Sequence, residues 1–148
     1  NTISAIMTSE RCAWAQTIYW PYYHVSNFGR GQVLQPIIHC EKYSSKEYDD
    51  VPLIDAAAVL TDEGEINLFV LNRSLSSEVD LKVDLRAFGE VSFQEHILLH
   101  HEDVNAINSE ADPGAVMPVS LQDCEIGLED LVVRVPALSW NVYRFKMK

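Results

Sequence analysis

Apolar and polar residues alternate through most of the chain, which is the pattern of half-buried β-strands. In the segment VDLKVDL at 79–85, every second residue is apolar and the residues between them are charged. This predicts an antiparallel strand with one face in a core and the other in water. The segment EINLFVLN at 65–72 is apolar on both faces. It predicts a central strand that pairs with 54–60 across a turn at 61–64.

The same patterning predicts further strands on both sides of this hairpin. They are expected at 33–40, 91–99, 131–135 and 138–147, with a short strand near 116–121 inside an otherwise polar segment at 103–129. The prolines of this region fall at predicted strand ends or edges, where a missing amide proton is tolerated. About seven or eight such strands are enough to close two packed sheets. The sequence therefore predicts an all-β fold, a two-sheet antiparallel β-sandwich.

The first thirty residues follow a different pattern. Apolar residues recur there every three or four positions, which predicts the buried face of a helix. The residues of this predicted face are Trp14, Ile18, Tyr22 and Val25. Pro21 is placed to start or kink the helix, and Gly29 to end it with a positive φ. We therefore predict that residues 1–30 form a helical appendage and that residues 31–148 form one sandwich domain.

Composition limits the classes of partner. The chain carries 22 acidic and 11 basic residues, a formal net charge of -11. Such a surface repels phosphate backbones and anionic lipids, so no nucleic acid and no membrane is expected as partner, and a neutral ligand such as a sugar stays open. Cys12, Cys40 and Cys124 are odd in number and lack metal-ligand spacing. This favours reduced thiols in a cytoplasmic protein.

The predicted sandwich contains no recognisable catalytic pair. Hydrolysis of a glycoside needs a carboxylic acid with a raised pKa that faces a second carboxylate across the scissile bond. The carboxylates here cluster around Tyr43 and Tyr48 or follow two histidines, and a solvated charged face explains them. Those histidines, His100 and His101, are adjacent at a predicted strand end, so their side chains point to opposite faces and do not suit one metal ion. We expect neither a metal nor a cofactor.

Gln16 is the one candidate binding residue. It follows Trp14 and precedes an aromatic cluster, so its amide is expected to be partly buried beside an indole ring. An amide donates to and accepts from sugar hydroxyls, and an indole offers a flat apolar face to a sugar. From these residues alone the alternative is favoured, in which Trp14 belongs to the core and Gln16 is a satisfied polar group.

Four segments carry a more specific signal: AWAQTIYWP at 13–21, KEYDDVPLIDAAAV at 46–59, LFVLNRS at 68–74 and VDLRAFG at 83–89. In this order they resemble the C-terminal portion of an α-L-arabinofuranosidase of glycoside hydrolase family 51. The resemblance implies a jelly-roll sandwich preceded, at 1–30, by the last loop and helix of a catalytic (β/α)8 barrel. It also implies that both catalytic glutamates lie upstream, so that the isolated chain has no hydrolase activity.

The same resemblance implies an activity and a role for Gln16. Enzymes of the family hydrolyse terminal non-reducing α-L-arabinofuranosyl groups of arabinan, arabinoxylan or their oligosaccharides, with retention of configuration and without a metal. The glutamine of their AWRQTI-like segment hydrogen-bonds the arabinose at the mouth of the barrel, and Gln16 stands at that position. This sequence departs from the family at Ala15, commonly arginine, and at 10–12, usually a glycine-containing turn. A homo-oligomer is also implied.

Two other roles stay open for the sandwich. It is either an independent carbohydrate-binding module or a structural and oligomerising domain that braces the barrel. A binding module exposes a row of aromatic side chains. Trp140, Tyr143 and Phe145 lie in a strongly patterned strand and are expected in the core, which leaves Tyr43 and Tyr48 as the exposed pair. We therefore expect the bracing role.

Overall fold

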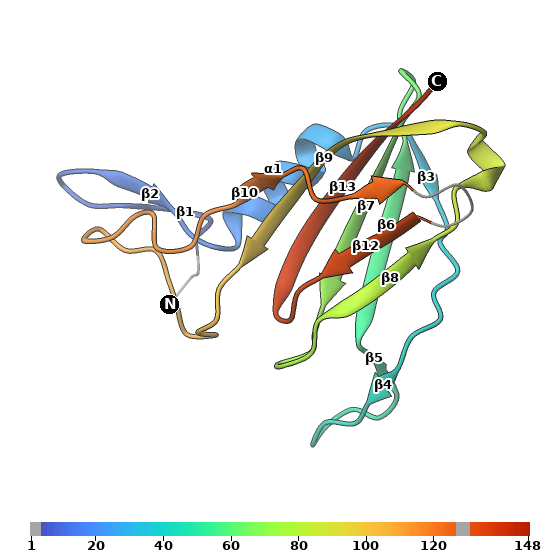
Figure 1. The fold of residues 1–148 in the computed structure, drawn as a ribbon. Coiled ribbons are helices and arrows are strands. Elements are labelled where there is room, and N and C mark those ends of the chain that lie inside the picture. The colour runs from blue at the N-terminus through green and yellow to red at the C-terminus, as the bar shows by residue number, and fades with distance from the viewer. Residues whose placement is uncertain (1–3, 127–130) are drawn as a thin grey trace.

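Two antiparallel sheets face each other in the computed structural model, which describes residues 4–126 and 131–148 (Figure 1). The larger sheet has the strand order β10–β9–β13–β7–β6–β3, and the smaller has the order β11–β12–β8. The larger sheet contains β3 (Gln32–Leu34), β6 (Ile54–Leu60), β7 (Glu65–Asn72), β9 (Val91–His100), β10 (Val119–Leu121) and β13 (Ser139–Met147). The smaller sheet contains β8 (Val79–Val83), β11 (Glu125–Ile126) and β12 (Leu131–Val135). The predicted all-β, two-sheet sandwich is confirmed.

Short elements extend from this sandwich. They are β1 (Ile6–Thr8), β2 (Ala13–Ala15), α1 (Tyr19–Phe28), β4 (Lys42–Tyr43), β5 (Val51–Pro52) and the 3-10 turn η1 (Arg86–Phe88). Figure 1 shows the β1–β2 ribbon projecting from one side of the sandwich and the β4–β5 ribbon from another. The long loop between β9 and β10 runs beside the β1–β2 ribbon. Within the described part of the chain, no helix has the length and apolar character that a membrane crossing needs.

The strand β7 lies centrally in the larger sheet, as predicted, and pairs with β13 on one side and β6 on the other. Its residues Ile66, Leu68 and Val70 join the core between the two sheets. Phe69 faces the other way, into a second apolar cluster with Trp140. The strand is apolar on both faces because both faces of its sheet are covered.

The strand β8 lines the opposite wall of the core. Its alternate apolar residues pack against the core between the sheets, which confirms the half-buried strand predicted at 79–85. Tyr143 of β13 is 1% exposed, and its hydroxyl donates to the main-chain oxygen of Arg134 in β12 at 2.6 Å. This hydrogen bond joins the larger sheet to the smaller one.

Helix α1 covers the outer face of the larger sheet. His24 is 2% exposed, and its Nδ1 accepts a hydrogen bond from the indole N–H of Trp140 at 3.2 Å. At the end of the helix, the side-chain amide of the buried Asn67 donates to the main-chain oxygen of Phe28 at 2.9 Å. That bond satisfies one of the carbonyls that a helix leaves unpaired at its C-terminus.

The predicted buried face of the helix is wrong. Trp14 lies in β2, ahead of the helix. The other three residues of the predicted face are exposed: Ile18, Tyr22 and Val25. The spacing of the pattern is helical, but the sheet lies against the neighbouring stripe that contains His24 and Phe28. Periodicity detects a helix with an apolar side and does not say which neighbour covers that side.

Two smaller predictions, for the end of the helix and for the strand that follows it, are also corrected. Gly29 ends α1, but with a φ of -95°. The positive φ falls at Gly31, at 143°, where an added Cβ would lie 2.3 Å from the main-chain oxygen of Leu60. The strand predicted at 33–40 is shorter, because its pairing with β6 spans only Gln32–Leu34. Pro36 lies two residues after Leu34 and has no amide proton to continue the ladder.

Candidate functional site

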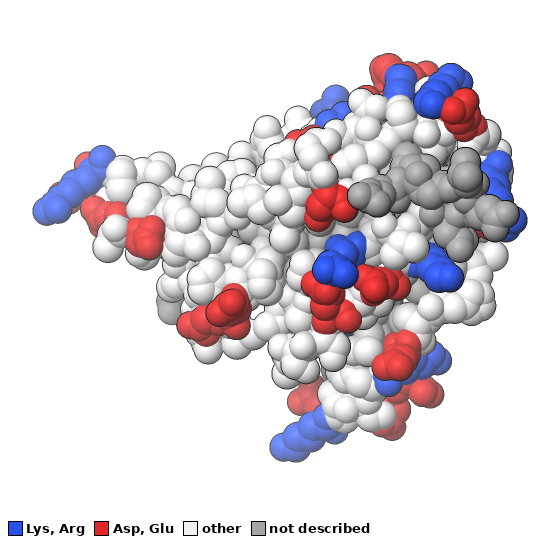
Figure 2. All heavy atoms as spheres, viewed as in Figure 1, with Lys and Arg blue, Asp and Glu red and all other residues white. Residues whose placement is uncertain are grey.

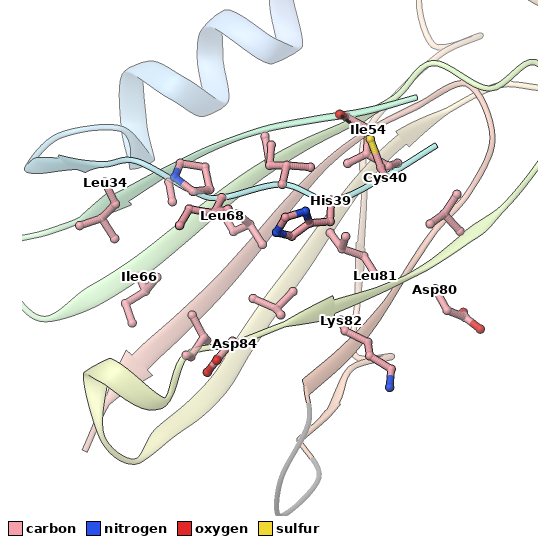
Figure 3. A pocket seen from close by; sticks show the side chains of 18 of the residues that line it. Leu34, His39, Cys40, Ile54, Ile66, Leu68, Asp80, Leu81, Lys82 and Asp84 are labelled. Atoms are coloured by element: carbon pink, nitrogen blue, oxygen red, sulfur yellow. Dashed lines mark hydrogen bonds between the residues drawn. The ribbon is translucent and has the colours of Figure 1, made fainter. Parts of the chain in front are cut away.

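A cavity of about 1500 Å³ opens between the two sheets. Figure 3 shows that it is lined by apolar side chains of β6, β7 and β8 and by the segment 35–41, and that Leu81 points into it whereas Lys82 and Asp84 point away. The side chain of Arg86 donates to both carboxylate oxygens of Asp84, at 2.9 and 2.6 Å, and lowers the pKa of Asp84 to about 2. A general acid for glycoside hydrolysis needs the opposite shift.

Charged side chains are interspersed on the face of the molecule in Figure 2. Arg134, for example, lies 3.2 Å from Glu78 and 3.5 Å from Asp80, and all three side chains are at least half exposed. Among the residues that the structure describes, no three histidine, cysteine or acidic side chains are grouped to hold a metal ion. His101 is exposed and accepts a hydrogen bond at Nδ1 from the main-chain N–H of Asp103, at 3.0 Å.

Gln16 follows the strand β2 and is half-buried. Its main-chain N–H donates to the oxygen of Ala5 at 2.9 Å, which closes the open end of the β1–β2 ribbon. Its side-chain Nε2 donates to the main-chain oxygen of Asn108 at 3.0 Å. Asn108 belongs to the long loop between β9 and β10, so Gln16 is bonded directly to a loop that joins two strands of the larger sheet.

Asn108 is fully buried, and its side chain bonds two other pieces of main chain. Its Nδ2 donates to the oxygen of Ala15 at 2.9 Å and to the oxygen of Val116 at 3.0 Å. Its Oδ1 accepts from the N–H of Val116 at 2.7 Å. The sequence does not point to Asn108, because one asparagine in a polar loop gives no signal that the fold buries it.

These bonds fix the orientation of the Gln16 amide. A main-chain oxygen only accepts hydrogen bonds, so the atom of the Gln16 amide that contacts Asn108 is Nε2 and not Oε1. Gln16 is therefore a partly satisfied polar group, whose Oε1 and second N–H have no hydrogen-bond partner among the residues that the structure describes. Close by in the chain, the buried Nε1 of Trp14 has no hydrogen-bond partner among the described residues.

Residues 1–139 match the family described as the α-L-arabinofuranosidase C-terminal domain. The chain belongs to this family. An intracellular exo-α-(1→5)-L-arabinofuranosidase from Halalkalibacterium halodurans is 39% identical over 150 residues, which covers 100% of this chain and 30% of that protein. A protein of the same description from Bacillus subtilis is 36% identical over 148 residues and is matched over 29% of its length.

A solved structure supports the same assignment. A family 51 α-L-arabinofuranosidase from Bifidobacterium longum superimposes with a TM-score of 0.87 at 29% identity, over 98% of this chain and 29% of that one. The chain is therefore similar to the C-terminal domain of family 51 arabinofuranosidases, and spans less than a third of the length of the relatives that it matches. The resemblance recognised from the four sequence segments is confirmed.

Proposed function

We propose that this arabinofuranosidase C-terminal domain works as the supporting domain of a longer retaining α-L-arabinofuranosidase. In this proposal residues 1–30 are the last loop and helix of the catalytic barrel, residues 31–148 are the sandwich that braces it, and the catalytic glutamates lie upstream. The observation that carries the proposal is the match of the entire chain to just under a third of an exo-arabinofuranosidase. The isolated chain is then inactive, and turnover by the purified chain would contradict this.

The exposed side of α1 supports the bracing role. One side of the helix is fixed to the sandwich through His24, while Tyr22 is 68% exposed and Tyr23 45% exposed on the helix surface that the sandwich leaves open. Large exposed aromatic side chains in one patch are typical of a surface that another part of a protein covers. The rest of the barrel is the partner that the proposal assigns to this surface.

Gln16 is proposed to contact the arabinofuranosyl group through the part of its amide that Asn108 does not occupy. In the longer enzyme, Gln16→Ala should lower kcat/KM on an aryl α-L-arabinofuranoside by an amount equivalent to about 1–3 kcal/mol, the usual loss for a buried hydrogen bond. Gln122→Ala is a matched control, because its Nε2 also donates to a main-chain oxygen, that of Gln94 at 3.1 Å. Unchanged kinetics for Gln16→Ala would exclude this role.

A second candidate is an independent carbohydrate-binding module. It is favoured by Tyr48, which is 68% exposed in the loop of the β4–β5 ribbon, and by Tyr43, 38% exposed in β4. Titrating the isolated chain with arabinan or arabinoxylan separates the two proposals. Saturable binding that is lost on Tyr48→Ala would favour the module, and no binding would favour the bracing role.

The cellular setting and assembly complete the proposal. We propose an intracellular, reduced environment, which is supported by the description of two relatives as intracellular and by the free thiols of Cys12, Cys40 and Cys124. The substrate class is arabinan, arabinoxylan or oligosaccharides derived from them, and the longer enzyme is proposed to be a homo-oligomer. Size measurement of that enzyme by light scattering tests the last point.

A further inference from the structure

The contact between Gln16 and the sandwich depends on one buried side chain. The Gln16 amide is bonded to the main-chain oxygen of Asn108, and that oxygen is held in place by the Asn108 side chain through the oxygen of Ala15 and both polar main-chain groups of Val116. The loop of 101–118 otherwise consists mainly of exposed residues. The side chain of Asn108 bonds this loop to the β1–β2 ribbon through the oxygen of Ala15.

We propose that Asn108 is a positioning residue for arabinofuranoside binding, which acts through Gln16. This inference rests on the proposed role of Gln16 in contacting the sugar. Asn108 holds the Gln16 amide by its Nε2, so that Oε1 accepts a hydrogen bond from a sugar hydroxyl. A domain that supplies no catalytic carboxylate would in this way set the geometry of substrate binding in the barrel.

Asn108 preorganises the Gln16 side chain for binding. A glutamine side chain has several rotamers, and a free one loses conformational entropy when it orders around a ligand. The bond to Asn108 imposes much of that order before the sugar arrives. Without the hydrogen bond to Asn108, Gln16 can adopt orientations that offer the sugar an N–H where an acceptor is needed. Loss of this bond is therefore expected to weaken binding as well as turnover.

Asn72 provides a matched control for the structural part of this role. It is also buried, and its Nδ2 donates to two main-chain oxygens, those of Ser77 and Val135, both at 3.0 Å. Its Oδ1 accepts from the N–H of Ser74 at 2.9 Å. All of these bonds lie within the sandwich. Asn72→Ala therefore removes hydrogen bonds of the same number and kind as Asn108→Ala, two from Nδ2 and one to Oδ1, without involving Gln16.

The test compares these two variants in the longer enzyme with an aryl α-L-arabinofuranoside. Asn108→Ala should lower kcat/KM about tenfold, the equivalent of one lost hydrogen bond, and raise KM. Asn72→Ala should lower the melting temperature by about as much as Asn108→Ala does, but leave kcat/KM at the wild-type value. Asn108→Ser, whose hydroxyl both donates and accepts hydrogen bonds, serves as the second variant if Asn108→Ala does not fold. Equal kinetic losses for Asn72→Ala and a folded Asn108 variant would overturn the proposal.

A double-mutant cycle distinguishes this proposal from the role of Gln16 itself. If Asn108 acts through Gln16, adding its substitution to Gln16→Ala should change kcat/KM no further. Independent, multiplying losses would overturn the positioning role while leaving the sugar contact of Gln16 intact. If Gln16→Ala alone has wild-type kinetics, the sugar contact fails, and the positioning role with it.

Discussion

The indole Nε1 of Trp140 donates a hydrogen bond to Nδ1 of His24 at 3.2 Å and thereby joins the larger sheet to α1. A ring nitrogen that accepts a hydrogen bond carries no proton, so this contact requires neutral His24 with its proton on Nε2. Burial lowers the pKa of His24 below its ordinary value of 6.5, and the charge of Glu95 opposes this in part. The joint between helix and sandwich is thus sensitive to protonation.

This relationship predicts a pH dependence of stability. Below about pH 6.5 the unfolded chain binds a proton at His24 that the folded chain resists, so the free energy of unfolding falls as the pH drops from 6.5 towards the lower folded pKa. Above 6.5 the contribution is fully present. Between pH 7.5 and pH 5.0, urea unfolding should show a larger decrease in the free energy of unfolding for the wild type than for His24→Asn, whose amide does not titrate. Parallel losses in the two proteins would contradict this assignment.

Arg144 ties the strands of the larger sheet to the helix. Its guanidinium donates to Glu65 at 2.9 Å and to Glu95 at 3.1 Å, and lies 4.4 Å from the centre of the Phe28 ring. The side chains of all three charged residues are less than a third exposed. Arg144→Met should reduce the free energy of unfolding by about 1–3 kcal/mol, because it leaves two partly buried carboxylates without their cation.

Arg134 provides the control for this prediction, because it also pairs with two carboxylates but its side chain is 66% exposed. Arg134→Met should change the free energy of unfolding by no more than about 0.5 kcal/mol, as is usual for exposed ion pairs. Urea titrations followed by tryptophan fluorescence measure both variants. A loss for Arg134→Met as large as that for Arg144→Met would refute the role given to partial burial.

The sequence predicts the strands of the sandwich well where the pattern of apolar and polar residues has a single structural explanation. Strands β7, β8 and β9 lie close to their predicted bounds, since an alternating or doubly apolar segment has one simple explanation in a two-sheet core. The helix is found but its buried face is misassigned, because His24, a titratable residue, is buried against Trp140. Such polar burial depends on a partner 116 positions away along the chain.

The two residues of the candidate site differ in the same way: one can be recognised from its neighbours in the sequence, and the other only from contacts with distant parts of the chain. Gln16 stands out through its aromatic neighbours and through the family resemblance, both of which are local features of the sequence. Asn108 does not, because its role depends on bonds to residues 92 and 93 positions away. The ribbon of β4 and β5 was also missed, since two-residue strands give no periodic signal.

Tyr143 offers a test of how the two sheets are held together. Its hydroxyl bonds the oxygen of Arg134 in the other sheet, and burial raises the pKa of Tyr143 above its ordinary range, so the group stays neutral at physiological pH. Tyr143→Phe keeps the ring but leaves a main-chain oxygen without this donor, at a cost of about 1–2 kcal/mol. Tyr48→Phe, at an exposed position, should have no measurable effect. Equal melting temperatures for wild type and Tyr143→Phe would contradict the prediction.

The cysteines differ in reactivity for physical reasons that can be measured. Cys12 is exposed in the turn of the β1–β2 ribbon, whereas burial, with a contribution from Asp123, raises the pKa of the Cys124 thiol from 9.0 to about 11. The thiolate is the nucleophile, and with this raised pKa Cys124 is almost entirely in its unreactive thiol form at pH 8. Iodoacetamide should therefore modify Cys12 first and Cys124 much more slowly in the folded chain, as followed by peptide mass spectrometry. In urea the two rates should converge, and a native Cys124 that reacts as fast as Cys12 would show that its thiol is neither buried nor held protonated.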